Sequence, residues 1–146
     1  MDVEKFWENR EKETGSRLVA RTAVNYVNGF EGLKKPVEGG LLYLMENGFY
    51  FENFQSTNFI VTTVLKKEFE KVSFHIPLAD VIDVYDFFGN RKPVKVSLKY
   101  RIIHFFSTKP KQLNIEYTNS RNEKSKITFT TFLDPLLLCE EYHKLV

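Results

Sequence analysis

Apolar residues alternate with polar ones along most of this chain, from Arg17 to Phe132. A period of two is typical of strands that bury one face and solvate the other. Glycine, asparagine and proline divide the alternation into strands and turns. The segments that read as strands are 17–27, 41–54 (a hairpin), 70–78, 80–88, 94–106, 113–117 and 127–132. The pattern predicts a mainly β fold of seven or eight antiparallel strands, with a loop over 29–40.

The period changes to 3.6 near both ends of the chain, which predicts two helices. Residues 3–14 are bounded by Asp2, a suitable N-cap, and by Gly15, a suitable stop. The closing segment 135–146 starts with a proline, which fits the first helical position, after an aspartate that can cap the helix. The residues on the apolar sides of the two helices are Val3, Phe6, Trp7, Leu138, Cys139, Tyr142, Leu145 and Val146.

The hairpin around Asn47-Gly48 is apolar on both faces. A two-residue turn at Asn-Gly favours type I′ geometry and predicts that Met45 lies opposite Tyr50. The first face consists of Leu42, Leu44, Phe49 and Phe51, and the second of Leu41, Tyr43, Met45 and Tyr50. One face can form the core, so the other needs a cover. That cover is either the first helix or a partner, and the candidate partner-binding residues are Phe6, Trp7, Tyr43, Met45 and Tyr50.

Two segments resemble a known family. The hairpin "GGLLYLMENGFYFEN" is similar to the Gly-x-Leu-Tyr-Leu-Thr-x-x-Gly-Leu-x-Phe hairpin of GRAM and bacterial pleckstrin-homology-like (PH-like) domains. The later "FHIPLADVIDV" is similar to their Ile-Pro-Leu-x-Asp-Ile-x-x-Val segment, in the same order along the chain. The resemblance implies a PH-like antiparallel β-barrel of about seven strands with a C-terminal capping helix. We therefore expect an N-terminal helix over 1–15 and a single domain over 16–146.

The resemblance also implies a function. PH-like domains bind anionic lipids, peptides or partner proteins near one end of the barrel, and their lipid sites use a basic cluster around the first strand pair. The candidates for such a cluster here are Arg17, Arg21, Lys34 and Lys35. We expect a non-enzymatic interaction module that binds a protein partner or an anionic membrane surface.

A second group of cations lies later in the chain. Its members are Arg91, Lys92, Lys95, Lys99 and Arg101. In the predicted strand, the last three share the face opposite the apolar residues, where they can bind an anionic surface or simply contact solvent. The net charge of +2 is too small to indicate nucleic-acid binding by itself.

Two alternatives remain open. Arg17 and Arg21 have the Arg-x-x-x-Arg spacing of PilZ domains, which are antiparallel barrels that bind cyclic di-GMP. In the second PilZ motif, Tyr43 would replace the acid and Met45 the serine, so the motif is degenerate. The other alternative is a structural subunit that self-associates through the aromatic hairpin face.

The residues with catalytic or metal-binding chemistry form no familiar constellation. His75 and His104 lie in predicted strands, and Cys139 and His143 have i, i+4 spacing on the last helix but lack further ligands. No phosphate-binding glycine loop or nucleophile elbow occurs. We expect no enzyme activity, no cofactor and no metal. A single cysteine and a start without a secretory signal favour the cytoplasm, with any membrane contact at the surface.

Overall fold

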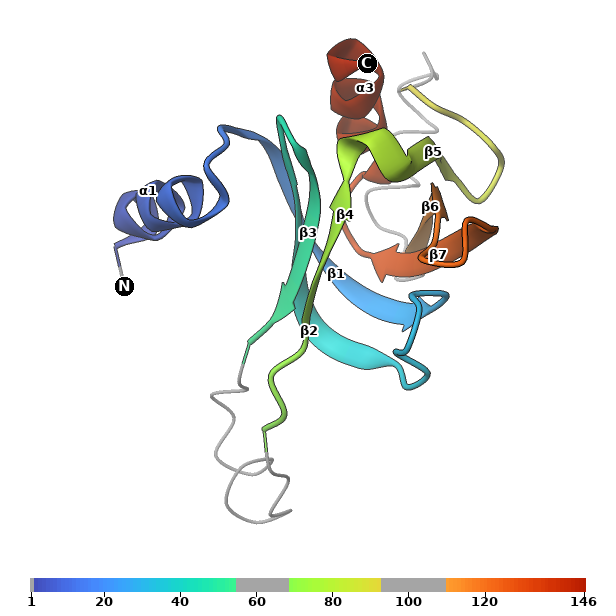
Figure 1. The fold of residues 1–146 in the computed structure, drawn as a ribbon, viewed down its shortest axis with the longest axis horizontal. Helices are drawn as coiled ribbons and strands as arrows, with labels where there is room; N and C mark the ends of the chain where they lie inside the picture. Colours follow the sequence, from blue (N-terminus) through green and yellow to red (C-terminus); the bar gives the residue numbers. More distant parts are fainter. Residues whose placement is uncertain (1, 55–68, 93–109) are drawn as a thin grey trace, which may run out of the picture.

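Seven antiparallel strands form one sheet, with the order β4-β3-β2-β1-β7-β6-β5 (Figure 1). The computed structural model describes residues 2–54, 69–92 and 110–146. The elements within these ranges are α1 (Val3–Thr14), β1 (Leu18–Asn28), β2 (Val37–Met45), β3 (Gly48–Asn53), β4 (Ser73–Pro77), the 3₁₀ helix η2 (Leu78–Asp80), β5 (Val81–Asp86), β6 (Lys111–Thr118), β7 (Lys124–Thr131) and α3 (Pro135–Leu145). The mainly β prediction is confirmed. The predicted strand over 94–106 lies outside the described residues.

Both predicted helices are confirmed, together with their caps. The Asp2 carboxylate accepts hydrogen bonds from the first free amides of α1, and Gly15 ends that helix in the left-handed conformation (φ +68°). The Asp134 carboxylate accepts the amide hydrogen of Leu136 at the start of α3. These boundaries follow from local chemistry, because each cap satisfies backbone groups that the helix itself leaves unpaired.

The main core lies between the inner face of the sheet and α3. Strands β2 and β3 contribute Leu42, Leu44, Phe49 and Phe51, as the period predicted. The buried core residues of β5, β6, β7 and α3 include Val84, Leu113, Ile115, Tyr117, Ile127, Phe129, Leu138, Cys139 and Tyr142. The helix α3 therefore closes one end of the sheet, as Figure 1 shows.

The sheet of the described residues is not closed into a barrel, because β4 and β5 form its two edges and do not pair with each other. The edge of β5 is covered by α3 instead. The Tyr142 hydroxyl donates to the Val81 carbonyl oxygen (3.5 Å), and His143 Nε2 lies 3.1 Å from the Val84 carbonyl oxygen.

The hairpin has the predicted faces in a different register. Tyr43 lies opposite Tyr50, and Met45 lies opposite Gly48, so the two-residue loop is Glu46-Asn47 rather than Asn47-Gly48. The partners thus slip by two residues relative to the prediction. A slip of two leaves every side chain on its predicted face, because the side-chain period of a strand is also two.

One predicted boundary and the burial of one side chain in β5 also differ from the prediction. The loop predicted over 29–40 ends earlier, because β2 begins at Val37 and pairs with β1. Regular alternation in the predicted strand over 80–88 would bury Ile82 together with Val84. Ile82 is instead half exposed, because an irregularity between Val81 and Asp83 shifts the register of β5 against β6.

Gly29 is a glycine at which backbone packing leaves no room for a side chain. It has φ +108°, and a Cβ placed there would lie 1.9 Å from the Lys126 carbonyl oxygen. Gly32, in the same loop, has φ +80° and nothing within 4 Å of a Cβ. We expect Gly32→Ala to lower the free energy of unfolding by about 1–2 kcal/mol through backbone strain alone. Gly29→Ala should cost at least about 1 kcal/mol more, because a steric clash is added.

Urea unfolding followed by circular dichroism measures both variants. Equal losses for Gly29→Ala and Gly32→Ala would contradict the close approach of Gly29 to β7.

Candidate functional site

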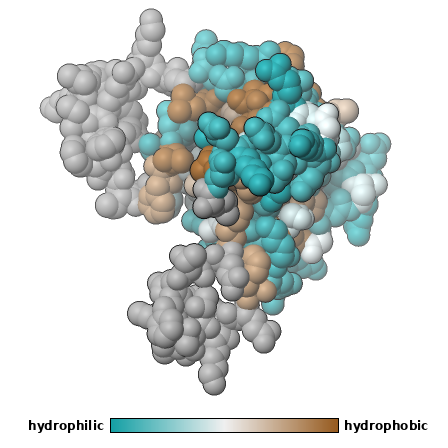
Figure 2. All heavy atoms as spheres, turned by 90° about the vertical axis from the view of Figure 1, so that its left-hand side faces the viewer, coloured by the Kyte–Doolittle hydropathy of each residue, from teal (hydrophilic) through white to brown (hydrophobic). Residues whose placement is uncertain are grey.

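The second face of the hairpin is covered by the protein's own first helix. Trp7 of α1 is 8% exposed and meets Tyr43 edge to face, with ring centroids 5.2 Å apart. Together with Met45 these two residues form a buried cluster, surrounded by Phe6, Leu18, Leu41 and Tyr50. Figure 2 looks onto the side of the molecule that carries α1, where hydrophilic residues dominate. The five candidate partner-binding residues therefore lie together in a contact within the chain.

A buried carboxylate anchors this helix to the sheet. Glu52 of β3 is on the outer face and accepts two hydrogen bonds of 2.8 Å from Arg10, one to each oxygen. The Tyr43 hydroxyl donates to Oε2 (2.7 Å), and Lys71 Nζ donates to Oε1 (3.3 Å). Three separate segments thus converge on one carboxylate, and the paired geometry of the guanidinium fixes the orientation of α1.

The network keeps Glu52 ionised. Burial by itself would raise the pKa of Glu52, but the hydrogen bonds from Arg10 and Tyr43 outweigh it and leave the pKa below its ordinary value. The hydrogen bonds that Arg10 donates to Glu52 also raise the pKa of Arg10. Burial and the neighbouring carboxylate raise the pKa of Tyr43, so its hydroxyl stays protonated and donates.

A polar groove runs beside this contact, between α1 and β4. Tyr50 stacks on Tyr43 (5.5 Å) and on His75 (4.1 Å), so that three rings cover the floor. The groove has a volume of about 600 Å³, and its walls include Arg10, Glu13 and Lys71. Partial burial lowers the pKa of His75, which favours a neutral ring in this stack.

The cations expected around the first strand pair do not form one cluster. Arg17 precedes β1, whereas Lys34 and Lys35 follow it, and the strand between them has eleven residues. At about 3.3 Å per residue, eleven residues span about 36 Å, so the two groups lie at opposite ends of the strand. Arg21 lies over the Trp7 ring, 5.0 Å from its centroid, and so belongs to the α1 contact.

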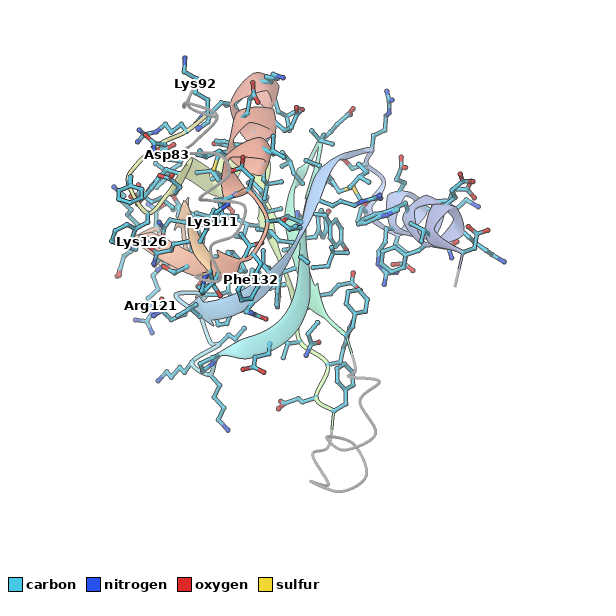
Figure 3. The ribbon with its side chains drawn as sticks, turned by 180° about the vertical axis from the view of Figure 1, so that it is seen from behind. Asp83, Lys92, Lys111, Arg121, Lys126 and Phe132 are labelled. Atoms are coloured by element: carbon cyan, nitrogen blue, oxygen red, sulfur yellow. The ribbon has the colours of Figure 1, made fainter. Side chains whose placement is uncertain are left out.

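The second group of cations is only partly described. Arg91 forms hydrogen bonds with both oxygens of Asp83, the shortest 2.6 Å, and this pairing offsets the effect of burial and lowers the pKa of Asp83. Lys92, the next residue in the chain, is exposed (Figure 3). Lys95, Lys99 and Arg101 lie outside the described residues, so the predicted stripe stays a prediction.

Sequence reasoning missed two exposed apolar pairs at one end of the sheet, Phe87-Phe88 after β5 and Phe132-Leu133 after β7, which we together call the apolar end. Strand pairing brings together the end of β5, the start of β6 and the end of β7. After β5, Phe87 is 69% exposed and Phe88 is 77% exposed. After β7, Phe132 is 67% exposed and Leu133 is 54% exposed. Figure 3 shows Lys111 beside Phe132 at this end. The signal in the sequence that could have indicated this surface is the pair of adjacent apolar residues that follows each of β5 and β7.

The turn that carries Phe87 and Phe88 is held in place. The buried Asp86 carboxylate accepts hydrogen bonds from the amides of Phe88 (2.9 Å) and Asn90 (2.7 Å). The two phenyl rings meet edge to face, with centroids 5.3 Å apart. Because the turn is already ordered, binding of a partner to this exposed aromatic pair would not carry a large entropic cost of ordering the loop.

The candidate reactive side chains are engaged in packing. Cys139 is fully buried in the core, and burial raises its pKa to about 12, so the thiol is not ionised at neutral pH. His143 bonds to the main chain of β5 rather than sharing a ligand with Cys139. His104 lies outside the described residues.

Comparisons with known proteins give no match to a family model, a curated protein or a solved structure. Neither helix in the described ranges has the length and apolar character needed to cross a membrane.

Replacing Glu52 should weaken the docking of α1 far more than replacing Glu13, although both carboxylates bond to Arg10. We expect Glu52→Gln to destabilise the docked helix by about 1.5–3 kcal/mol, because it removes buried, charged hydrogen bonds. Glu13→Gln should cost about 0.5 kcal/mol or less, because that pair is exposed. Trp7, the only tryptophan, reports docking by its emission during urea titration. Equal effects of the two variants would contradict the anchoring role of Glu52.

Acid should release α1 before the sheet unfolds. The pKa of Glu52 is lower in the folded state than its ordinary value of 4.5, so its stabilising effect is present above pH 4.5 and is lost as the pH falls through the folded pKa. We expect the Trp7 emission to shift reversibly to longer wavelength below pH 4.5, while far-ultraviolet circular dichroism still shows a folded sheet. Glu52→Gln should remove this transition. An identical transition in that variant would assign it to another group.

Proposed function

We propose that this chain is a non-enzymatic interaction module of PH/GRAM-like architecture that binds a protein partner through its apolar end. The single observation that carries the proposal is the exposure of Phe87, Phe88, Phe132 and Leu133 at one end of the sheet. Folded chains rarely leave several large apolar side chains exposed together, and such groupings commonly mark interaction sites. Seven antiparallel strands followed by a helix packed on the sheet agree with the layout that the sequence resemblance implies.

Among the described residues, the charges near the apolar end favour a protein partner over an anionic membrane. Lys111 pairs with Thr131 beside Phe132, and Lys92 follows the turn after β5, but Asp134 is exposed next to Leu133, and Arg91 is neutralised by Asp83. A membrane site gains from an excess of cations around the apolar residues. Aromatic residues surrounded by charges of both signs are the usual composition of a protein interface.

The test compares the full-length chain with two double variants, Phe87→Ser/Phe88→Ser and Phe132→Ser/Leu133→Ser. The matched control is Val3→Ser, which removes another exposed apolar residue far from the apolar end. Each protein is used as bait, captured proteins are quantified by mass spectrometry, and the strongest candidate is then purified and titrated directly. Burying one phenylalanine contributes about 1.5–3 kcal/mol, so each double variant should weaken the direct interaction at least tenfold.

The same variants also test whether the apolar end binds a membrane or a second copy of the chain instead of a partner protein. Loss of sedimentation with phosphatidylserine vesicles would assign the apolar end to a membrane, and loss of a dimer in light scattering would assign it to a second copy. Either result, or a direct interaction that both double variants retain at full strength, contradicts the proposed protein partner.

A further inference from the structure

The helix α1 is attached to the sheet by few side chains. Only Trp7 among its twelve residues is buried, and the network of Arg10 with Glu52 is its one buried ionic contact within the described residues. A helix of this length is marginal by itself, so its order depends on docking. The two principal anchors are an indole and a guanidinium three residues apart, which the helical period places on one side, and the partly buried Phe6 packs beside them.

The surface that receives these anchors belongs to the body of the sheet. Tyr43 and Met45 lie on β2, and Glu52 lies on β3, and both strands are paired on both sides. Their opposite faces are in the main core. The receiving surface is consequently held in place by contacts that do not involve α1, and it keeps its shape when the helix leaves.

The connection to α1 allows the helix to move away. Gly15 has left-handed backbone geometry, and three residues separate the end of α1 from β1. The contacts of this connection with the exposed hairpin loop are hydrogen bonds. Asn47 donates to the Thr14 carbonyl oxygen and to the Ser16 hydroxyl, and the Glu46 amide donates to the Arg17 carbonyl oxygen. Exposed hydrogen bonds of this kind exchange readily with water.

We propose that the outer face of β2 and β3 is a binding site for an amphipathic helix of a partner protein, one that carries an aromatic residue and an arginine three positions later. The chain's own α1 occupies this site in cis. The buried Glu52 carboxylate selects a guanidinium, since its two oxygens match that group and an unpaired carboxylate would be costly in the contact. The aromatic cluster of Tyr43 and its neighbours selects a flat apolar ring.

This site is separate from the apolar end, so the two proposals fail independently. Binding in trans must compete with α1, whose short tether gives it an effective concentration in the millimolar range. The intact chain should therefore bind such a helix weakly, and a chain whose own anchors are removed should bind it more tightly.

The experiment uses the full-length Trp7→Ala/Arg10→Ala variant, which contains no tryptophan. The probe is a synthetic peptide of residues 2–15, which contains the only tryptophan in the mixture. We expect a saturable shift of the peptide emission to shorter wavelength, and at least tenfold weaker binding to the wild-type chain, followed there by peptide anisotropy. No saturation up to about 1 mM peptide, or equal affinity for both chains, overturns the proposal.

Matched controls test the recognition chemistry. Adding Glu52→Gln to the double variant, or replacing Arg10 by Glu in the peptide, should weaken binding at least tenfold, because the charged hydrogen bonds are lost. Adding Glu46→Gln should leave binding unchanged, since that exposed acid lies outside the network. Equal effects of Glu46→Gln and Glu52→Gln overturn the assignment of Glu52.

A second measurement does not depend on a variant chain. Excess peptide is added to the wild-type protein, and the hydrogen exchange of the α1 amides is followed. Displacement of α1 should accelerate their exchange while the strands keep their protection. Unchanged exchange of α1 at a peptide concentration that saturates the wild-type chain, as measured by anisotropy, overturns the proposed competition.

Discussion

The apolar character of both faces of the β2–β3 hairpin governs the arrangement of the rest of the molecule. A hairpin of this kind cannot leave either face in water without a large loss of hydrophobic stabilisation. The inner face is buried by the other strands and by α3, and the outer face by α1. The first and last helices of the chain thus each bury one apolar face of the same pair of strands.

The two faces are covered in different ways. The inner face packs in a large core, whereas the outer contact combines one buried indole with a buried carboxylate. Hydrophobic contact alone would tolerate several orientations of a short helix, since it has no direction. The bidentate bonds from Arg10 to Glu52 select one of them. The outer face has the features of a recognition surface, because specificity there comes from a few directional groups.

Strand pairing organises the remainder of the surface. Because β5, β6 and β7 are antiparallel neighbours, segments separated by more than forty residues meet at one end of the sheet, where the apolar end forms. Among the described residues β5 is an edge strand, and Tyr142 and His143 of α3 contact its main-chain carbonyl oxygens. The four residues of the apolar end follow the ends of β5 and β7, where no further element among the described residues covers them.

The sequence by itself determined the helices, their caps and the two faces of the hairpin, because these depend on neighbours a few residues apart. Even a register slip of two left the faces unchanged. Only the tertiary structure decided which element covers the outer face, because Arg10 and Glu52 are 42 residues apart and either could have had another partner. The same reason applies to the open edges of the sheet, the separation of Arg17 from Lys34, and the apolar end. Each depends on which strands pair, and a local pattern of apolar residues carries no information about that choice.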